Sequence, residues 1–277
     1  PVPQAPGPIG VFDSGYGGLT ILRQMRQLLP QYDYIYLGDN ARAPYGSHSF
    51  EVIYKYTLQA VEELFRRGCQ LVILACNTAS AKALRTIQER DIPHIDPSRR
   101  VLGVIRPTVE AVGPLTHTRH VGLLATAGTV NSGSYSMELR KLWPDIQVTG
   151  QACPMWVPLV ENYEFVSPGA DYFVKKRVLV IVRVAPDIDT LILGCTHYPL
   201  LMNKIVKYTP PGVRIVAQGE YVAQSLASYL QRHPDMEARL TQHGTCHYLT
   251  TESAATLEQR AALCMHEMVK AEHVELA

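Results

Sequence analysis

Residues 71–80 read LVILACNTAS, and this stretch decides the fold. An apolar run leads into Cys76, and two polar residues follow it at once. Such a run predicts a parallel strand that is buried on both faces and presents Cys76 at its carboxyl edge. Residues 190–199, TLILGCTHYP, repeat the pattern around Cys195. Because ligands of open α/β sheets bind outside the carboxyl ends of strands, the two cysteines mark a candidate site.

Strand and helix patterns alternate along the chain, which predicts an α/β fold with mainly parallel, doubly wound sheets. Strands are expected near residues 9–12, 34–37, 71–75, 101–105, 121–124, 146–151, 191–194, 213–217 and 247–251. Helices are expected near residues 19–29, 49–67, 79–89, 135–142, 173–184, 200–207, 221–232 and 254–269. Arg106-Pro107 interrupts the pattern, so we place a crossing into a second domain there.

The two halves of the chain resemble each other. Gly122 stands 112 positions after Gly10, each in an apolar strand pattern, and Cys195 stands 119 positions after Cys76. Similar offsets at two strand ends indicate that one half-domain was duplicated. Two pseudo-symmetric halves that face each other would place one thiol on each side of a bound ligand.

The composition narrows the class of protein. A chain of 277 residues, 47% apolar and 18% charged, suits two globular domains of about 100–150 residues each. Net charge is +1 and no basic stripe is present, which argues against nucleic acid as a partner. No apolar run approaches the roughly 18 residues of a membrane span. The opening PVPQAPGP lacks the basic and apolar regions of a signal peptide, and we expect it to form a loose arm.

Six cysteines in a long chain without a secretion signal are expected to be free thiols in the cytoplasm. Four of them lie outside the two strand-end motifs, namely Cys69, Cys153, Cys246 and Cys264. We expect Cys69, Cys246 and Cys264 to be structural, since free cysteine is commonly buried.

Several chemistries are possible for the loops that follow the predicted strands. DSGYGG (13–18) has the first spacing of a dinucleotide loop, but Thr20 occupies the place of the third glycine, so a carboxylate is an equally good ligand for this helix start. Asp13 is either an N-cap or a site residue. A metal site needs more ligands than Cys195 and His197. A redox pair would show C-x-x-C, and a single Cys–His nucleophile leaves Cys76 unused.

One further chemistry uses both cysteines. One thiolate removes a proton from a carbon, and the opposite thiol returns a proton to the other face, which inverts a stereocentre. A free thiol has a pKa near 8.5, and hydrogen-bond donors at a helix start can stabilise the thiolate.

Five segments in this order, FDSGYGGLT, GDNARAPYG, ACNTASA, CPMWVPLVE and LGCTHYP, resemble the glutamate racemases of the cofactor-independent aspartate/glutamate racemase superfamily. The resemblance extends from about residue 9 to beyond residue 230. It implies an active site in a cleft between two α/β domains, the first formed by 1–106 plus 219–277 and the second by 107–218. It also implies conversion of L-glutamate to D-glutamate for peptidoglycan synthesis, with no cofactor and no metal; a homodimer is a candidate assembly.

The resemblance makes Cys76 and Cys195 the two acid/base residues. Asp13 matches the carboxylate that assists Cys76, while Glu161 and His197 match the residues that assist Cys195. The substrate-binding positions that match are Asp13, Ser14, Tyr45, Gly46, Asn77, Thr78, Thr126, Thr129, Thr196 and His197. Such hydroxyl, amide and carboxylate groups suit an amino-acid zwitterion.

Some roles stay open at this point. His197 either transfers a proton or orients its neighbour, and Tyr45 either binds substrate or packs in its loop. The chain also departs from the family pattern, with Asn40 where many members have Thr and with Ala217-Gln218 where an Asp-Ser pair is common.

Two alternative functions remain. One is a racemase for aspartate or another small acidic substrate, and the other is a non-catalytic, two-lobed binder of acidic amino acids. The second cysteine argues against a plain binder, because closure around a ligand needs no thiols.

Overall fold

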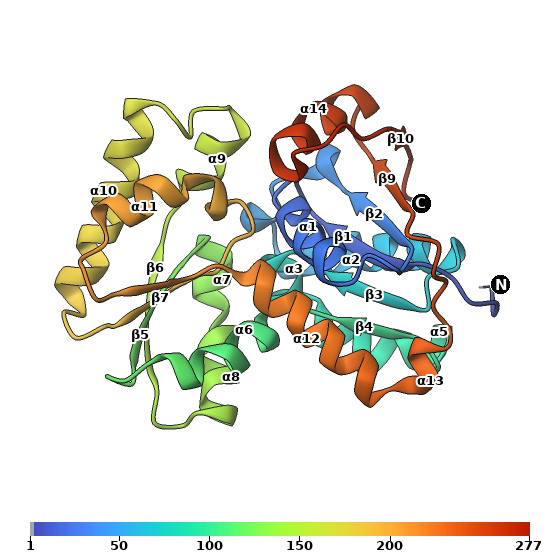
Figure 1. Cartoon of the computed structure of the whole chain (residues 1–277), viewed down its shortest axis with the longest axis horizontal. Helices are drawn as coiled ribbons and strands as arrows, with labels where there is room; N and C mark the ends of the chain where they lie inside the picture. Colours follow the sequence, from blue (N-terminus) through green and yellow to red (C-terminus); the bar gives the residue numbers. More distant parts are fainter. Residues whose placement is uncertain (1–2) are drawn as a thin grey trace.

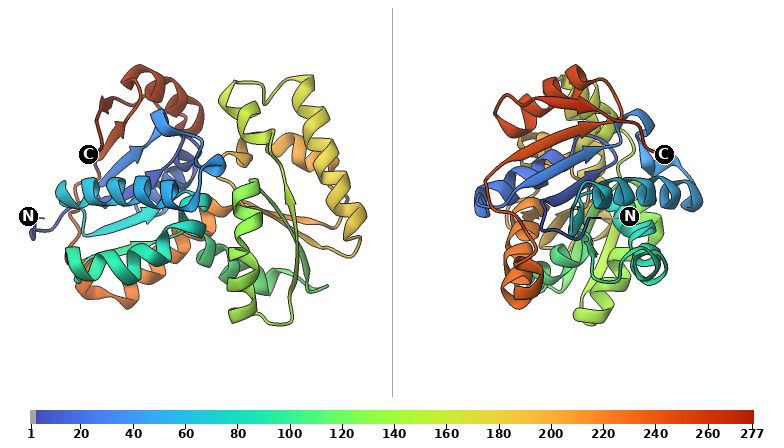
Figure 2. Two further views of the ribbon diagram at one scale, coloured as in Figure 1. Left: turned by 180° about the vertical axis from the view of Figure 1, so that it is seen from behind. Right: turned by 90° about the vertical axis from the view of Figure 1, so that its right-hand side faces the viewer.

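Two parallel β-sheets lie side by side in the computed structural model, which describes residues 3–277 (Figures 1 and 2). The first sheet has the strand order β10-β9-β2-β1-β3-β4, and the second has the order β6-β5-β7-β8. All the paired strands run parallel. The predicted α/β fold with two mainly parallel sheets is therefore confirmed.

The strands of the first sheet are β1 (Ile9–Asp13), β2 (Tyr34–Gly38), β3 (Leu71–Leu74), β4 (Arg100–Leu102), β9 (Cys246–Thr250) and β10 (Ala271–His273). Those of the second sheet are β5 (His120–Ala125), β6 (Gln147–Ala152), β7 (Thr190–Leu193) and β8 (Arg214–Val216). The first sheet thus draws its strands from both ends of the chain and the second from the middle. The domain boundaries at 106/107 and 218/219 stay a prediction.

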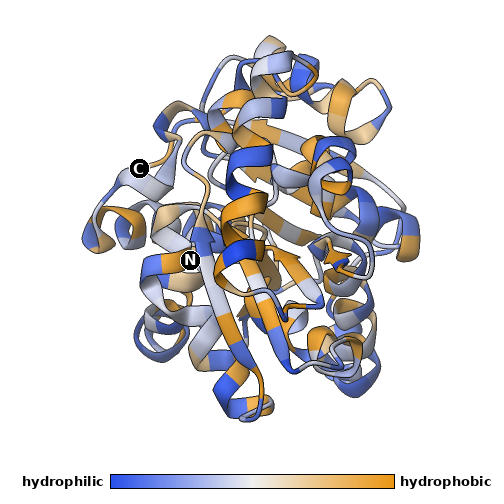
Figure 3. Ribbon diagram, turned by 90° about the vertical axis from the view of Figure 1, so that its left-hand side faces the viewer, coloured by the Kyte–Doolittle hydropathy of each residue, from blue (hydrophilic) through white to orange (hydrophobic). Residues whose placement is uncertain are grey.

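Helices cover both faces of each sheet, and the central strands are almost wholly apolar (Figure 3). The helices are α1 (Gly18–Leu28), α2 (Phe50–Arg66), α3 (Asn77–Lys82), α4 (Leu84–Thr86), α5 (Ile92–Ile95), α6 (Ile105–Val112), α7 (Ala127–Ser132), α8 (Ser134–Leu142), α9 (Trp156–Glu161), α10 (Pro168–Val184), α11 (Met202–Tyr208), α12 (Gln218–Arg232), α13 (Pro234–Glu237) and α14 (Ala254–Met265). On the first sheet, α1, α12 and α14 bury one face and α2 to α5 the other. On the second sheet, α9 to α11 and α6 with α8 do the same.

The strand orders show the internal repeat directly. The order β2-β1-β3-β4 in the first sheet is matched by β6-β5-β7-β8 in the second. In this equivalence β3 leads to Cys76 and β7 leads to Cys195. Both cysteines therefore lie at the carboxyl end of the strand in the same place of each half.

Several helices differ from the sequence prediction, and prolines explain two of the differences. Pro107 is the third residue of α6 and Pro158 the third of α9, two helices that the sequence analysis did not predict. Proline is tolerated in a first turn because the N–H that it lacks would have no partner there. The helix predicted at 79–89 begins earlier, at Asn77, breaks at Ala83 and continues through a π-helical turn. Also unpredicted were α7, α13 and β10.

The expected loose N-terminal arm is wrong for the residues that the structure describes; Pro1 and Val2 lie outside them. Gly7 donates to the carbonyl of Arg239 at 3.1 Å and accepts from the amide of Thr241 at 3.0 Å. The side-chain amide of Gln4 donates to Asp96 at 3.0 Å. The bonds of Gly7 attach the arm to the segment that follows α13, and the bond of Gln4 attaches it to the end of α5.

Within residues 3–277, no helix has the length and apolar character needed to cross a bilayer. All six cysteines are free thiols, and five of them are buried, with Cys246 half-buried.

Asp33 ties the start of β2 to the loop before β9, and this contact predicts an acid-sensitive stability. Its carboxylate accepts from the Thr245 amide at 2.9 Å, the Thr245 hydroxyl at 2.7 Å and the His243 amide at 3.1 Å. Burial alone would raise the pKa of Asp33, but hydrogen bonds from Thr241, Thr245 and His243 outweigh it and hold the pKa below its ordinary 3.8. A carboxyl with a lowered pKa stabilises the fold above its ordinary pKa, and this stabilisation is lost as pH falls below that value.

We expect Asp33→Asn to lower the free energy of unfolding at pH 7 by about 2 kcal/mol, the usual size of hydrogen bonds to a charged group. Urea unfolding at pH 7 and pH 3 measures this, and the difference from wild type shrinks at the lower pH. Asp235→Asn, an exposed carboxyl on α13, is the control and should change neither value. An Asp33 variant whose deficit is equal at both pH values would contradict the assignment.

Candidate active site

The carboxyl ends of the two sheets meet, and the backbone of Gly17 forms the closest contact. A Cβ at Gly17 would lie 2.4 Å from the Thr196 hydroxyl and 2.6 Å from Nδ1 of His197. Thr20, in the first turn of α1, donates its hydroxyl to the carbonyl of Thr196 at 3.1 Å. The start of α1 is thereby fixed against the loop that follows Cys195.

Cys76 lies two residues beyond β3 and begins α3. Its sulfur accepts from the amide of Ala79 at 3.4 Å and lies 3.3 Å from the hydroxyl of Ser14. Burial and the negative charges of Asp13 and Cys195 raise the pKa of Cys76 to about 12, although the Ser14 and Ala79 hydrogen bonds act in the opposite direction. Cys76 is therefore a neutral thiol near pH 7, and it lies within electrostatic reach of the other cysteine.

The carboxylate of Asp13 lies at the start of α1, whose N-cap residue is Gly17, and a role for Asp13 in the site stays a prediction. One carboxylate oxygen accepts from the amide of Gly18 at 2.7 Å, which caps the start of α1. The side chain is also almost fully buried beside the site, and burial raises its pKa while the charge of His197 lowers it. Asp13 thus lies at the helix start and within electrostatic reach of the residues around both thiols.

The side chain next to Cys195 is the imidazole of His197, whose charge when protonated is opposite to that of the Asp13 carboxylate. Nδ1 of His197 lies 3.8 Å from the Cys195 sulfur, and Nε2 bonds to the carboxylate of Glu161. Burial alone would lower the pKa of His197, but its contacts with Cys195 and Glu161 raise it well above the usual value. A protonated imidazole donates from both nitrogens, so this arrangement directs a positive charge at the Cys195 sulfur.

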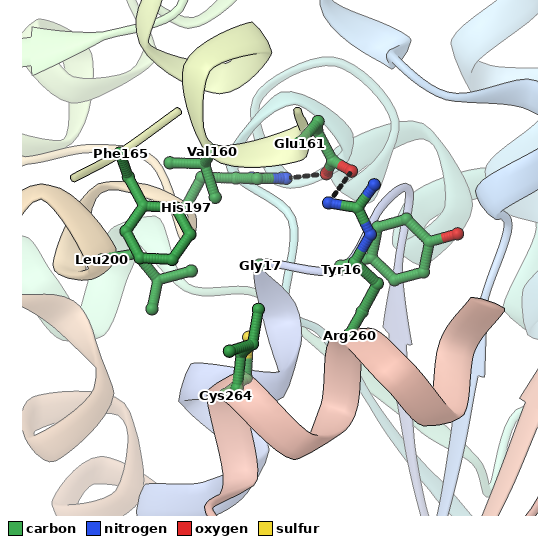
Figure 4. Close-up of a pocket in the computed structure, with 10 residues that line it drawn as sticks. Tyr16, Gly17, Val160, Glu161, Phe165, His197, Leu200, Arg260 and Cys264 are labelled. Carbon is green, nitrogen blue, oxygen red and sulfur yellow. Dashed lines mark hydrogen bonds and ion pairs between the residues drawn. The ribbon is translucent and has the colours of Figure 1, made fainter. Parts of the chain in front are cut away.

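A side chain from the far end of the chain completes this group. Arg260 of α14 places its guanidinium 3.8 Å from the second oxygen of Glu161, as Figure 4 shows. Its guanidinium carbon also lies 4.1 Å from the ring centre of Tyr163 and 5.2 Å from that of Tyr16. The Glu161 carboxylate is held between His197 and Arg260, in a pocket lined also by Gly17, Val160, Phe165, Leu200, Leu263 and Cys264.

The other predicted binding residues divide into two groups. Gly46, Thr78 and Thr126 are close together, since a Cβ at Gly46 would lie 3.7 Å from the Thr126 hydroxyl and 3.9 Å from that of Thr78. The Thr126 hydroxyl accepts from the amide of Thr129 and caps α7. Tyr45, by contrast, is buried with its hydroxyl bonded to Asp39, so its side chain packs in the loop.

Asn77 follows Cys76 directly, and its side chain is buried in a hydrogen-bond network. Its oxygen accepts from the Tyr135 hydroxyl at 2.6 Å, and its nitrogen donates to Gln218 at 2.7 Å. Gln218 is the one partner seen for this amide nitrogen among residues 3–277. Among residues 3–277, no three His, Cys, Asp or Glu side chains are grouped so that they could hold a metal ion.

Comparison with known proteins agrees with this geometry. The Asp/Glu/hydantoin racemase family model matches residues 9–226. The chain belongs to this family. A glutamate racemase of a Ruegeria species is 41% identical, over 91% of this chain and 94% of the relative, and one from Streptococcus gordonii is 37% identical over 97% and 98%. Among solved structures, a glutamate racemase from Bacillus anthracis matches with a TM-score of 0.89 and 34% identity over 98% of each chain. The protein is accordingly a racemase enzyme.

The sequence analysis did not place Arg260 near this site, and it noted Gln218 only in the Ala217-Gln218 departure from the family pattern. Both residues belong to helices that return from far along the chain, α14 and α12. The pattern of α14 shows only its apolar face, and an exposed-looking arginine on a helix gives no indication of its partner.

The Gly17 contact predicts a steric requirement of the racemase. Gly17 has right-handed helical backbone angles, φ −61° and ψ −30°, which any residue can adopt, so Gly17→Ala tests space alone. The added methyl must displace Thr196 and His197. We expect kcat/KM to fall by at least about 100-fold, because misplacement by about 1 Å has that effect on catalytic groups.

Steady-state kinetics and circular dichroism together test this expectation. Gly169→Ala on α10 is the matched control, since its Cβ would meet only Ser167 at 3.5 Å. A folded Gly17→Ala protein with wild-type kcat/KM would show that the contact is unnecessary for catalysis.

Proposed function

We propose that this racemase interconverts L- and D-glutamate, with Cys76 and Cys195 as its acid/base pair. The observation that supports this most directly is that two thiols lie at equivalent strand ends of a repeated fold, within electrostatic reach of each other. Curated relatives that share about two fifths of the sequence are named glutamate racemases. A glutamate racemase from Francisella tularensis, solved in complex with D-glutamate, matches with a TM-score of 0.83 and 31% identity over 98% of this chain and 97% of its own.

The charges around the two thiols suit opposite roles in one turnover. His197, when protonated, favours negative charge on the Cys195 sulfur, which then removes the α-proton of one enantiomer. Cys76 is protonated in the resting state and delivers its proton to the opposite face of the carbanion. The turnover leaves Cys195 protonated and Cys76 as the thiolate. That state is ready for the other enantiomer. The resemblance to glutamate racemases implies that Cys195 takes the proton from L-glutamate and Cys76 takes it from D-glutamate.

The substrate has two carboxylates and one ammonium group, and the surrounding groups complement them. Hydroxyls at Thr78 and Thr126, the backbone at Gly46 and the side-chain amide of Asn77 are donors for carboxylates. Asp13 is an acceptor for the ammonium. Supply of D-glutamate for peptidoglycan, a cytoplasmic location and a homodimeric assembly belong to the same proposal. Proton NMR of the protein with L-glutamate in D₂O tests the function directly, since racemisation replaces the α-hydrogen by deuterium.

The two-thiol mechanism predicts that each cysteine is necessary. Cys76→Ala and Cys195→Ala should each lower the rate of racemisation by about 10³-fold or more, near the upper range of general acid–base contributions, with the fold retained. Polarimetry from each enantiomer measures the rate. Cys246→Ala, a half-buried thiol of β9, is the control and should keep full activity. Full activity in either site variant would refute the two-base mechanism.

Because different side chains surround the two cysteines, substitutions on the two sides should slow proton removal from different enantiomers. Asp13→Asn should slow proton removal from D-glutamate most, since Asp13 lies beside Cys76, and His197→Asn should slow removal from L-glutamate most. Loss of Asp13 or His197 should weaken the neighbouring cysteine as a base, which slows proton removal by about 10²-fold or more. Because the equilibrium between enantiomers stays at one, the asymmetry is read from initial deuterium incorporation at the α-carbon, starting from each enantiomer. Equal deficits from both enantiomers in both variants would assign these residues to substrate binding alone.

A further inference from the structure

Gln218, the first residue of α12, is buried at the junction of the two halves, with 3% of its surface exposed. Its amide nitrogen lies 2.8 Å from the Tyr135 hydroxyl, 3.0 Å from the Thr108 hydroxyl and 3.1 Å from the Asn77 oxygen. Its oxygen accepts from the Asn77 amide at 2.7 Å. The side chain is thus surrounded by polar groups from α3, α6 and α8.

The hydrogen-bond partners of the Gln218 side chain determine the positions of its amide nitrogen and its amide oxygen. Its nitrogen faces the backbone carbonyl of Val104 at 3.4 Å, and a carbonyl can only accept. The Thr108 hydroxyl donates to the same carbonyl at 2.7 Å, so it must accept from Gln218. The Gln218 oxygen therefore points toward Asn77 and accepts from it.

This orientation determines that of Asn77 in turn. The two amides form a reciprocal pair, in which each nitrogen faces the oxygen of the other. The Tyr135 hydroxyl donates to the Asn77 oxygen and so occupies its remaining side. Only one hydrogen of the Asn77 amide is left without a partner among the described residues, and Asn77 directly follows Cys76.

The same amide joins both connections between the two sheets. Val104 and Thr108 belong to the segment that leads from β4 toward the second sheet, and Gln218 lies where the chain returns after β8. α12 contacts both α1 and α6, so it is packed against both halves. A single buried side chain therefore links the two crossings to the residue next to the catalytic thiol.

We propose that Gln218 is a positioning residue: it holds the Asn77 amide so that its free hydrogen binds a substrate carboxylate, and it sets the relative position of the two halves at the crossing. This inference rests on the proposed function for its substrate. Asn77 binds substrate and transition state alike, so its misorientation raises KM and leaves kcat nearly unchanged.

Gln218→Met keeps the length of the side chain and removes every hydrogen bond. We expect KM for glutamate to rise about tenfold and kcat to change less than about threefold, in line with the loss of one hydrogen bond to a charged group. Gln218→Glu is the second variant: it keeps the acceptor for Asn77 but turns an oxygen toward the Asn77 oxygen, and it should raise KM at least as much. Gln224→Met, on an exposed position of the same helix, is the matched control and should leave KM unchanged.

A double-mutant cycle with Asn77→Ala separates positioning from a general structural effect. If Gln218 acts through Asn77, Gln218→Met adds nothing to the KM of Asn77→Ala. If the increases in KM from Gln218→Met and Asn77→Ala add in the double variant, and all these proteins keep the wild-type melting temperature, the inference is overturned. The proposed function is unaffected by that result, because it rests on the activity of the wild type. A wild type without activity on glutamate would refute the proposed function instead.

The positioning is also measurable without turnover. The side-chain amide protons of Asn77, assigned in ¹⁵N-labelled protein by their loss in Asn77→Ala, should exchange slowly in the wild type because the amide is buried and one of its hydrogens is bonded to Gln218. They should exchange at least about tenfold faster in Gln218→Met and at the wild-type rate in Gln224→Met. Unchanged exchange in Gln218→Met would overturn the inference whatever the substrate.

Discussion

The backbone of Gly17 lies against Thr196 and His197 with no room for a methyl group, and the close approach of the two sheets at this point depends on this contact. Each sheet alone would present one thiol to solvent, where it could not hold a ligand between two bases. The contact brings the start of α1, with Asp13 at its cap, against the loop that carries Cys195. The absence of a side chain at one position is thus what allows two separately folded sheet edges to form one site.

The two halves share a strand order but differ in charge. The side chain next to Cys76 is a buried carboxylate, whereas that next to Cys195 is an imidazole whose positive charge is held by Glu161, which Arg260 approaches from α14. The two halves thus supply the same strand order around the two thiols, and a few different side chains supply different charges beside them. Inversion of a stereocentre needs both, because one group must release a proton while the other accepts one.

Sequence patterns were sufficient where burial determines structure. The runs before Cys76 and Cys195 are apolar throughout because their strands are covered on both faces, so strand, direction and edge could all be predicted. They were insufficient where a side chain meets a partner far along the chain. Gln218 and Arg260 are polar residues on helices, and only the return of α12 and α14 to the cleft shows what they contact. The helices α6 and α9, which contain Pro107 and Pro158, were not predicted for a different reason. Proline breaks a helix in its interior but is compatible with its first turn.

The place of β9 in the first sheet has a consequence for synthesis. β2 pairs with β1 on one side and with β9 on the other, and β9 ends at Thr250. The ribosome therefore completes all four strands of the second sheet, up to Val216, while one edge of β2 still lacks its neighbour. An unpaired edge of a parallel sheet is a template for association with other chains. This edge of β2 is therefore open to association between nascent chains until residue 250 is translated, and a truncation between residues 216 and 250 should leave a first sheet without β9 beside a complete second sheet.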